Sequence, residues 1–437
     1  MSLGWLFSLQ HRQRTRKQVV LDQCFLILAK KKKKKTKKEP IALNMNRIGN
    51  ALRADLSPGL CRRFYHLPNP LASEQAATRS LTPVTKLSTL RSCKPGYQGY
   101  TRRQPLHRRP LHTDQQTKGT MMSQRSNIQP QKVDAPLTQF ATFLVLTVKD
   151  TPDAIKTARS AVAGIEDLTK NIAIRDLNAL FTCTVGIGSN IWDKLTGLPR
   201  PAELHLFKEV KGKKHTAVST PGDILFHIRS ERRDLCFEFE RQLMDQLGDA
   251  VSLVDETQGF RYFDVRDLLG FVDGTANPVS PAIPESVLVN EDNPSCVGGS
   301  YIVVQKYIHD IPGWKALSTE AQEAVIGRTK LDNVELDDAE SGQQQSHKSL
   351  ATIEDDDGEE HEILRDNMPF GSPGSGEFGT YFIGYSAELW VIERMMERMF
   401  VGDPPGLHDR ILDFSKPLTG STFFAPSASV LAQLEDD

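Results

Sequence analysis

Four side chains in this sequence are of types that could do chemistry together. Asp273 stands in a turn at 270–278 (GFVDGTANP), where Asp-Gly supplies a bend and a residue free to take positive φ. His347 lies in a polar segment, and Arg365 and Asn367 stand two residues apart before Met-Pro-Phe-Gly. A carboxylate can move a proton, a guanidinium can stabilise developing negative charge, and an imidazole can bind a metal. Spacing alone also fits ordinary turn and loop residues.

Other catalytic templates find no support in the sequence. The segment 374–379 matches Gly-x-Gly-x-x-Gly but precedes a predicted strand, whereas a dinucleotide fingerprint follows a strand and opens a helix. A protein kinase would need His-Arg-Asp and Asp-Phe-Gly, and a hydrolase Gly-x-Ser-x-Gly or His-Glu-x-x-His, none of which occurs. The six cysteines form no Cys-x-x-Cys pair, so we expect neither a zinc site nor a disulfide framework.

The elements that must position these residues follow a repeated strand–helix pattern. Apolar, β-branched runs predict strands, and apolar residues at helical spacing predict helices. Before Asp273 these are strands at 140–148 and 180–187, an apolar stretch at 224–228, and helices at 155–165, 190–195 and 235–247. After it they are strands at 301–307 and 380–385, a helix at 319–326 opened by a capping box at 319–322, and a helix with Leu389, Ile392, Met396 and Met399 on one buried face. The repetition predicts a duplicated α+β sandwich, with an antiparallel sheet and helices in each half.

The first 130 residues differ from the rest in charge. They hold 26 Lys or Arg and 5 Asp or Glu, whereas the remainder holds 28 and 50. Their composition predicts a disordered arm. The lysine run at 30–38 is typical of a nuclear or nucleic-acid patch, the stretch from Met45 resembles a mitochondrial transit peptide, and an extension without a structural role, ahead of a start at Met121 or Met122, is the third interpretation.

A long polar segment at 332–362 interrupts the second half. Its acid run at 354–360 fits either a solvated surface or a cation site for Mn²⁺ or Ca²⁺. No stretch reaches the roughly 20 apolar residues that a membrane-spanning helix needs, so we expect a soluble chain.

Taken together, the motifs around Asp273, His347 and Arg365 resemble the dye-decolorizing peroxidase family, in particular its compact bacterial-type subgroup. The resemblance runs from about residue 140 to residue 424 and includes 299–306 (GSYIVVQK) and 379–385 (GTYFIGY). It implies a fold of two ferredoxin-like halves. We therefore expect three parts: a basic extension or targeting segment at 1–130, an N-terminal half at 134–278 that ends in the Asp273 motif, and a C-terminal half at 279–437.

The resemblance also implies a haem peroxidase with one haem b per chain. His347 corresponds to the iron ligand, Asp273 to the acid that transfers the proton of peroxide, Arg365 to the group that stabilises the leaving oxygen, and Asn367 to an amide that can donate to bound peroxide. Further expected haem contacts are Gly274, Thr275 and Phe370. The alternative is a haem-handling protein in which peroxide turnover is incidental.

The expected partners are hydrogen peroxide and small aromatic or dye-like reductants, with no nucleic acid and no membrane. We expect a homo-oligomer, as the subgroup often forms. The expected location is cytoplasmic, or mitochondrial if the basic arm is a transit peptide.

Overall fold

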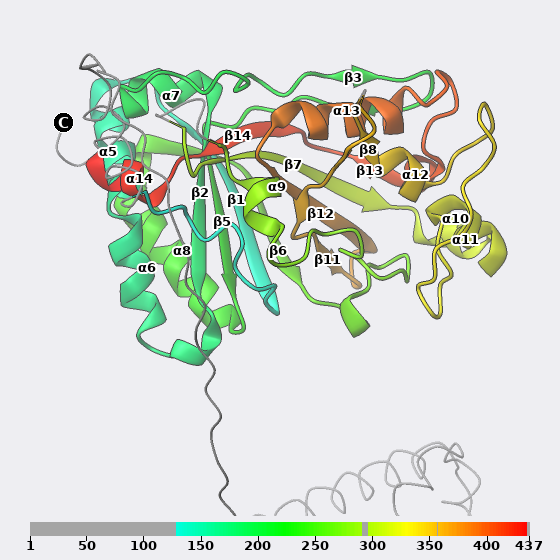
Figure 1. Cartoon of the computed structure of the whole chain (residues 1–437). Coiled ribbons are helices and arrows are strands. Elements are labelled where there is room, and N and C mark those ends of the chain that lie inside the picture. The colour runs from blue at the N-terminus through cyan, green and yellow to red at the C-terminus, as the bar shows by residue number, and fades with distance from the viewer. Residues whose placement is uncertain (1–127, 291–295, 356, 435–437) are drawn as a thin grey trace, which may run out of the picture. The chain divides into compact units, whose positions relative to one another are not determined.

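The computed structural model describes residues 128–290, 296–355 and 357–434, so the predicted arm lies almost wholly outside the described residues. Figure 1 shows two halves, the first coloured cyan to green and the second green to red. Within the described residues, no helix combines the length and the apolar character required to cross a bilayer.

The N-terminal half is a four-stranded antiparallel sheet with helices on one face. Its main elements are β1 (Phe140–Val148), α5 (Pro152–Ala163), α6 (Ile165–Ala173), β2 (Thr182–Gly188), α7 (Ser189–Thr196), β5 (Ile224–Ser230), α8 (Arg233–Leu247) and β6 (Val251–Phe260). The strand order is β2-β5-β1-β6, and every pairing is antiparallel. Between α7 and β5 in the sequence, the chain forms a short hairpin of β3 (Val210–Lys211) and β4 (Thr216–Ala217), which lies outside the four-stranded sheet.

The C-terminal half repeats the same arrangement. Its elements are β7 (Ser300–His309), α10 (Ile311–Lys315), α11 (Thr319–Ile326), α12 (His347–Ala351), β10 (Leu364–Arg365), β11 (Met368–Ser372), β12 (Glu377–Ser386), α13 (Leu389–Phe400), η4 (Arg410–Asp413), β13 (Ser415–Pro417), β14 (Ser421–Ala425) and α14 (Ala428–Gln433). The order β10-β12-β7-β14 matches that of the first half, strand for strand. The smaller elements are η1 (Leu177–Ala179), η2 (Gly248–Ala250), η3 (Phe263–Val265), α9 (Ile283–Val287), β8 (Ile353–Glu354) and β9 (Glu360–His361).

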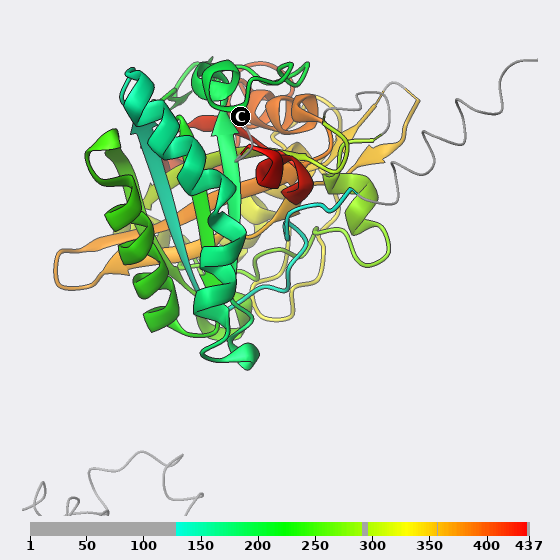
Figure 2. The same ribbon diagram turned by 90° about the vertical axis from the view of Figure 1, so that its left-hand side faces the viewer.

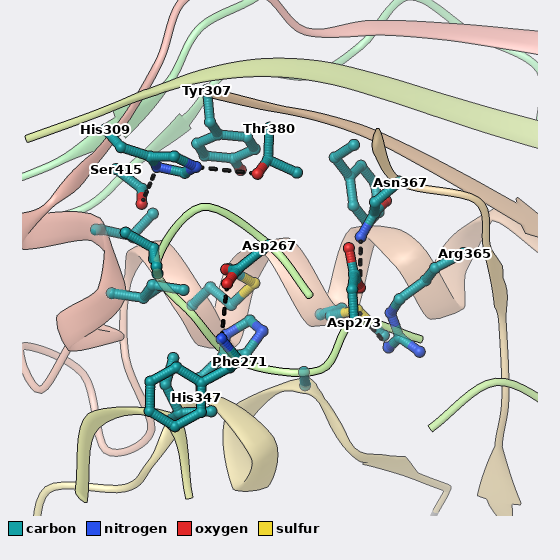
Figure 3. A pocket seen from close by; sticks show the side chains of 18 of the residues that line it. Asp267, Phe271, Asp273, Tyr307, His309, His347, Arg365, Asn367, Thr380 and Ser415 are labelled. Atoms are coloured by element: carbon teal, nitrogen blue, oxygen red, sulfur yellow. Dashed lines mark hydrogen bonds between the residues drawn. The ribbon is translucent and has the colours of Figure 1, made fainter. Parts of the chain in front are cut away.

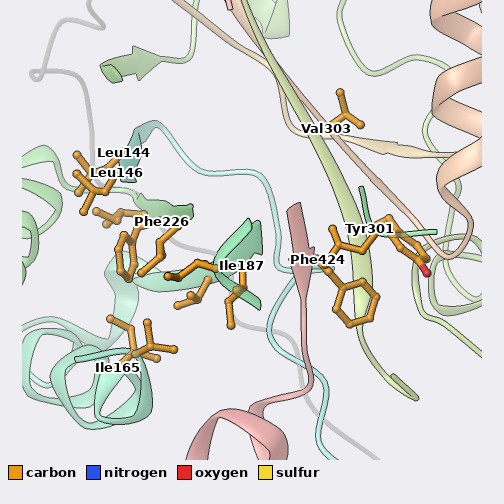
Figure 4. Close-up of a cluster of buried hydrophobic side chains, with 14 of the residues drawn as sticks. Leu144, Leu146, Ile165, Ile187, Phe226, Tyr301, Val303 and Phe424 are labelled. Atoms are coloured by element: carbon orange, nitrogen blue, oxygen red, sulfur yellow. The ribbon is translucent and has the colours of Figure 1, made fainter. Parts of the chain in front are cut away.

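Side-chain alternation along the strands produces two cores. In β1, Leu144 and Leu146 face the helices, and Figure 4 shows them in one buried cluster that reaches Phe424. Phe143 faces the other way, where its ring stacks on Tyr381 of β12 at 4.1 Å between centroids. The helix-free faces of the two halves therefore pack on each other, and a short β14–β2 pairing joins them into one hydrogen-bonded sheet. Figure 2 shows helices α5, α6 and α8 covering the outer face of the first half.

The structure confirms the predicted duplicated α+β sandwich, with local corrections. The helix predicted at 155–165 ends at Ala163, and Ile165 begins the separate helix α6 after Gly164. The capping box at 319–322 is wrong by one residue, because Ser318 is the N-cap and accepts a hydrogen bond from the Ala321 N–H. Strand β6 was missed because it is a partly exposed edge strand with no clean apolar alternation. The polar segment 332–362 contains α12, which has too few apolar residues to be predicted as a helix.

Candidate active site

A cavity of about 170 Å³ lies in the C-terminal half, between its sheet and its helices (Figure 3). Methionines of α13 and apolar residues of η4 form much of its wall, and β7 and β12 form another part. Polar side chains reach the cavity from three further segments: the loop after β6, helix α12, and the β10–β11 connection. The polar residues from these segments are Asp267, Asp273, His347, Arg365 and Asn367. The structure therefore brings the four predicted site residues to one cavity.

The loop that carries Asp273 is shaped by a second carboxylate, Asp267. Its Oδ1 accepts hydrogen bonds from the backbone N–H groups of Gly270 (2.8 Å) and Phe271 (2.9 Å). Gly270 has φ +97°, which a side chain would disfavour. Val265, whose carbonyl accepts from the Asp273 N–H, has φ +61°, an unfavourable value for a β-branched residue. Backbone strain of this kind occurs at sites held by their surroundings, and here it fixes Asp273.

Three hydrogen bonds tie the Asp273 turn to the β10–β11 connection, one made by Asp273 and two by Asn277. The Oδ1 atom of Asp273 accepts from the Gly274 N–H at 2.7 Å and from the Asn367 amide nitrogen at 3.2 Å (Figure 3). Asn277, four residues on, bonds both backbone groups of Arg365: its Nδ2 donates to the carbonyl and its Oδ1 accepts from the N–H. The turn and the connection therefore form one unit.

The Arg365 guanidinium has no carboxylate hydrogen-bond partner among the described residues. It donates to the Ala276 carbonyl at 3.3 Å and lies 3.5 Å from the sulfur of Met395 on α13. Burial lowers its pKa, while the charge of Asp273 opposes that shift. Several guanidinium N–H donors therefore remain available to an anion or oxygen in the cavity.

Asp366 lies between two site residues but points away from the cavity. Its carboxylate pairs with Arg229 of β5 at 3.2 Å, and both side chains are about 1% exposed. Burial raises the pKa of Asp366 although Arg229 opposes the shift. The pair connects the first half to the strand segment that carries Arg365 and Asn367.

His347 is the first residue of α12, whose N-cap Ser346 accepts from the Ser349 N–H. The Nδ1 atom of His347 hydrogen-bonds Asp409 Oδ2 at 2.6 Å, and Asp409 is fully buried. The His347 side chain is 35% exposed and lines the cavity. Burial alone would lower its pKa, but the Asp409 carboxylate outweighs burial and holds the pKa above its ordinary value.

One end of the cavity is closed by a neutral histidine. His309 bonds Ser415 through Nδ1 (2.8 Å) and Thr380 through Nε2 (2.9 Å), as Figure 3 shows. Burial lowers its pKa to about 4. At the other side, burial first and the charge of Asp273 second raise the pKa of Asp267 to about 7, although backbone hydrogen bonds oppose this.

Three residues expected at the haem do not line the cavity in the part of the chain that the structure describes. Gly274 has φ +70° and turns the chain behind Asp273. Thr275 is exposed, and its hydroxyl bonds the Val272 carbonyl. Phe370 is 5% exposed in the core between the two sheets, because its position in β11 points it away from the helices.

Sequence reasoning missed several residues that build the site. Asp409 stands 62 positions from His347, and no local pattern links them. Asp267 and Asn277 look like ordinary turn residues, although an Asp three residues before a glycine is a signal for an Asx turn. The methionines of α13 were predicted to be core, and they are buried, but Met395, Met396 and Met399 also form the cavity wall.

Comparison with known proteins identifies the family. The model described as "Dyp-type peroxidase, N-terminal" matches residues 130–261, and "Dyp-type peroxidase, C-terminal" matches residues 264–430. A dye-decolorizing peroxidase of Brevibacterium linens is 51% identical over 302 residues, which is 69% of this chain and 82% of the relative. Deferrochelatases of Escherichia coli match more weakly, at 25% identity over 280 residues.

Solved structures give the same result. DyPB from Rhodococcus jostii RHA1 is 52% identical with a TM-score of 0.67, covering 69% of this chain and 97% of that one. A variant of the same protein in complex with heme is 51% identical with the same TM-score. These matches span both halves of the fold and every residue of the cavity. The chain therefore belongs to the Dyp-type peroxidase family.

Proposed function

We propose that this haem-dependent peroxidase holds haem b through His347 and activates hydrogen peroxide with Asp273, Arg365 and Asn367. The observation that carries the proposal is a single cavity. One helix brings to it an imidazole backed by a carboxylate, and two other segments bring a carboxylate, an amide and a guanidinium. Haem-handling as the principal function is not favoured, because relatives near 50% identity are dye-decolorizing peroxidases and deferrochelatases match at 25%.

The residues present fit a haem. With Nδ1 of His347 engaged by Asp409, Nε2 is left as the metal-binding nitrogen, the usual arrangement of a ligating histidine and its carboxylate partner. The methionine-rich wall suits the apolar face of a porphyrin, and the partly buried guanidinium of Arg365 still has donors to offer.

When bound, the haem would supply the two-electron reduction of peroxide, which is balanced by the one-electron oxidation of two donor molecules. Asp273 accepts a proton from one oxygen of peroxide and returns it to the oxygen that leaves as water. The Asn367 amide, which donates to Asp273 Oδ1, holds that carboxylate in place. The Arg365 guanidinium stabilises the negative charge that develops on the leaving oxygen.

The second substrate is a small aromatic or dye-like reductant. The apolar walls, with Phe382 and Met399 among their residues, are covered by the porphyrin in this proposal, so a donor within the cavity has only the remaining space and must be small. Turnover of a series of phenols of increasing size would check this, since an undiminished rate with the bulkiest members would contradict a donor site within the cavity.

Assembly and location are further parts of the proposal. We propose a homo-oligomer, because edge strand β6 and neighbouring α8 expose Leu253 (54%) and Phe237 (61%). Light scattering that reported only monomer would contradict it.

We propose a cytoplasmic location, or a mitochondrial one if the basic arm acts as a transit peptide. Microscopy of a carboxyl-terminal fluorescent fusion, with and without residues 1–127, distinguishes these.

The test is peroxide-driven dye oxidation by the haem-loaded chain and by Asp273→Asn. We expect the variant to retain haem but to lose about 10²–10⁴-fold in its reaction with peroxide, the usual contribution of a positioned acid–base group. Asp264→Asn is the matched control, because Asp264 lies in the same loop and is exposed. If Asp273→Asn and the control reacted alike, the role of Asp273 would be refuted.

A further inference from the structure

Two histidines and an aspartate meet outside the active-site cavity. His215 lies in the turn between β3 and β4. His408 lies just before η4, and Asp413 is the last residue of η4. The three side chains are 16–19% exposed, so they are partly shielded yet open to solvent. Their ligand atoms all lie within 4.8 Å of one another.

The hairpin is held firmly against the second half. The Gly212 N–H donates to the His215 carbonyl, which closes the turn. A Cβ on Gly212 would lie 1.8 Å from the carbonyl oxygen of Phe400, the last residue of α13, so only glycine permits this approach. The position of His215 is therefore fixed by backbone packing and does not depend on its own side-chain contacts.

One oxygen of Asp413 carries an unusual number of donors. Oδ1 accepts from Lys214 Nζ at 2.5 Å, His215 Nε2 at 2.9 Å and His408 Nε2 at 3.0 Å. A carboxylate oxygen has about two lone-pair positions, so three donors exceed what it accommodates well. Two imidazole nitrogens and one carboxylate oxygen have the composition of a metal site, and rotation of the side chains would bring these atoms, now within 4.8 Å of one another, onto one ion.

We propose that His215 Nε2, His408 Nε2 and Asp413 Oδ1 bind a divalent transition-metal ion of the zinc class. Imidazole nitrogen with one carboxylate oxygen is a donor set for Zn²⁺ and its transition-metal neighbours, whereas Ca²⁺ and Mg²⁺ prefer oxygen ligands alone. Three protein ligands leave a fourth position for water. Binding requires each imidazole to carry its proton on Nδ1, so the two Nε2 hydrogen bonds to Asp413 are exchanged for bonds to the ion.

The surrounding charges agree with this assignment. Burial would raise the pKa of Asp413, but its contacts with Lys214, His215 and His408 outweigh burial and hold the pKa below its ordinary value, so the carboxylate is ionised. Lys214 Nζ is the donor nearest to Asp413 Oδ1 and its charge opposes a bound cation, yet the Lys214 side chain is 58% exposed and is free to turn into solvent. Arg410 is more distant, 3.7 Å from the other oxygen, Oδ2.

The site adjoins the partner of the predicted iron ligand. His408 directly precedes Asp409, whose carboxylate bonds His347. A bound ion would fix 408–413 to the β3–β4 hairpin and so hold Asp409 in position from outside the cavity.

The test is zinc content after dialysis of the haem-loaded, full-length chain against micromolar Zn²⁺, with zinc and iron counted separately by mass spectrometry. We expect wild type to retain one zinc more per chain than either His215→Ala or Asp413→Asn, at equal iron. His205→Ala is the matched control, because His205 contacts only one carboxylate, that of Glu393, and it should bind as much zinc as wild type.

Lys214→Ala gives an independent second result. Removing a cation that competes for Asp413 Oδ1 should tighten zinc binding in a calorimetric titration, whereas a cluster that serves only as a hydrogen-bonding hub would show no zinc heat in either protein. Equal zinc content in wild type and His215→Ala, together with unchanged binding by Lys214→Ala, would overturn the proposal. His215 lies in a hairpin turn, so its variant remains decisive even if Asp413→Asn does not fold.

Discussion

The two halves of the molecule share one strand order but cover their sheets differently. In the first half, Leu144 and Phe226 face the long helices and are 0–1% exposed. The corresponding strands of the second half, β7 and β12, instead present His309 and Thr380 to a cavity. The same topology therefore supports a solid core in one half and a functional site in the other.

Helix length explains the difference. The first crossover of the first half consists of α5 and α6, of 12 and 9 residues. The second helical layer is similar in both halves, because α8 has 15 residues and its counterpart α13 has 12. In the second half the corresponding crossover is divided into α10, α11 and α12, of 5, 8 and 5 residues. Short helices cannot cover the sheet completely, so space remains beneath α13, and polar loop residues enter it. Substitutions in the two halves can test this contrast.

The largest effect on folding is expected at the connection between the halves. Arg229→Ala leaves Asp366 as an unpaired buried carboxylate, which typically costs about 3–5 kcal/mol. Urea unfolding of the purified chain measures it. Arg241→Ala is the control, since its ion pairs on α8 are exposed and are worth about 0–1 kcal/mol. Equal losses in the two variants would show that the halves do not depend on this pair.

Truncating a side chain in the closed core of the first half should lower the free energy of unfolding more than truncating one beside the cavity of the second half. Leu146→Ala should cost about 2–5 kcal/mol, because it opens a void in a closed core. Phe382→Ala should cost less in the haem-free chain, because its side chain already borders the cavity. Urea unfolding curves of both variants measure the two losses. A larger loss of unfolding free energy for Phe382→Ala than for Leu146→Ala would contradict the proposed difference in packing.

Arg365→Leu tests whether the cavity does the peroxide chemistry. Removing a group that stabilises transition-state charge costs about 2.7–4 kcal/mol, or roughly 10²–10³-fold in rate. We expect that loss in the stopped-flow reaction with peroxide, at unchanged haem content. Arg394→Leu, an exposed arginine of α13 paired with Glu397, should react like wild type. Normal kinetics in Arg365→Leu would remove the guanidinium from the proposed mechanism.

A smaller effect is expected from the pH dependence of stability. Burial raises the pKa of Asp267 to about 7, so between about pH 4 and 7 the folded chain keeps a proton that the unfolded chain has released. The contribution of this group to stability is therefore full below that window and declines as pH rises through it. Asp267→Asn should flatten the decline in unfolding experiments on the haem-free chain. A slope identical to that of wild type would show that Asp267 does not titrate there.

Much of the scaffold could be predicted from sequence because its pattern is local. The strand predicted at 140–148 begins and ends at the same residues as β1. Nearly every residue in it is buried and is apolar or β-branched. Strand β6 could not be predicted, because an edge strand needs no apolar run. Asp273, His347, Arg365 and Asn367 were assigned through the resemblance to a known family, and they reach one cavity.

The rest of the site depends on contacts across long separations. Asp409 acquires its role only when η4 folds beside α12, and Met395 only when α13 passes over Arg365. Nothing in the residues next to Asp409 or Met395 distinguishes them from a helix cap and a core methionine. Such partners become visible only in three dimensions.

The central claim is that His347 binds the haem iron from the wall of this cavity. Haem content and the Soret spectrum of His347→Ala test it most directly, with His361→Ala, a histidine that does not line the cavity, as the control. We predict that His347→Ala purifies without stably bound haem, whereas the control retains it. A His347→Ala protein with full haem occupancy and a wild-type Soret band would contradict the account.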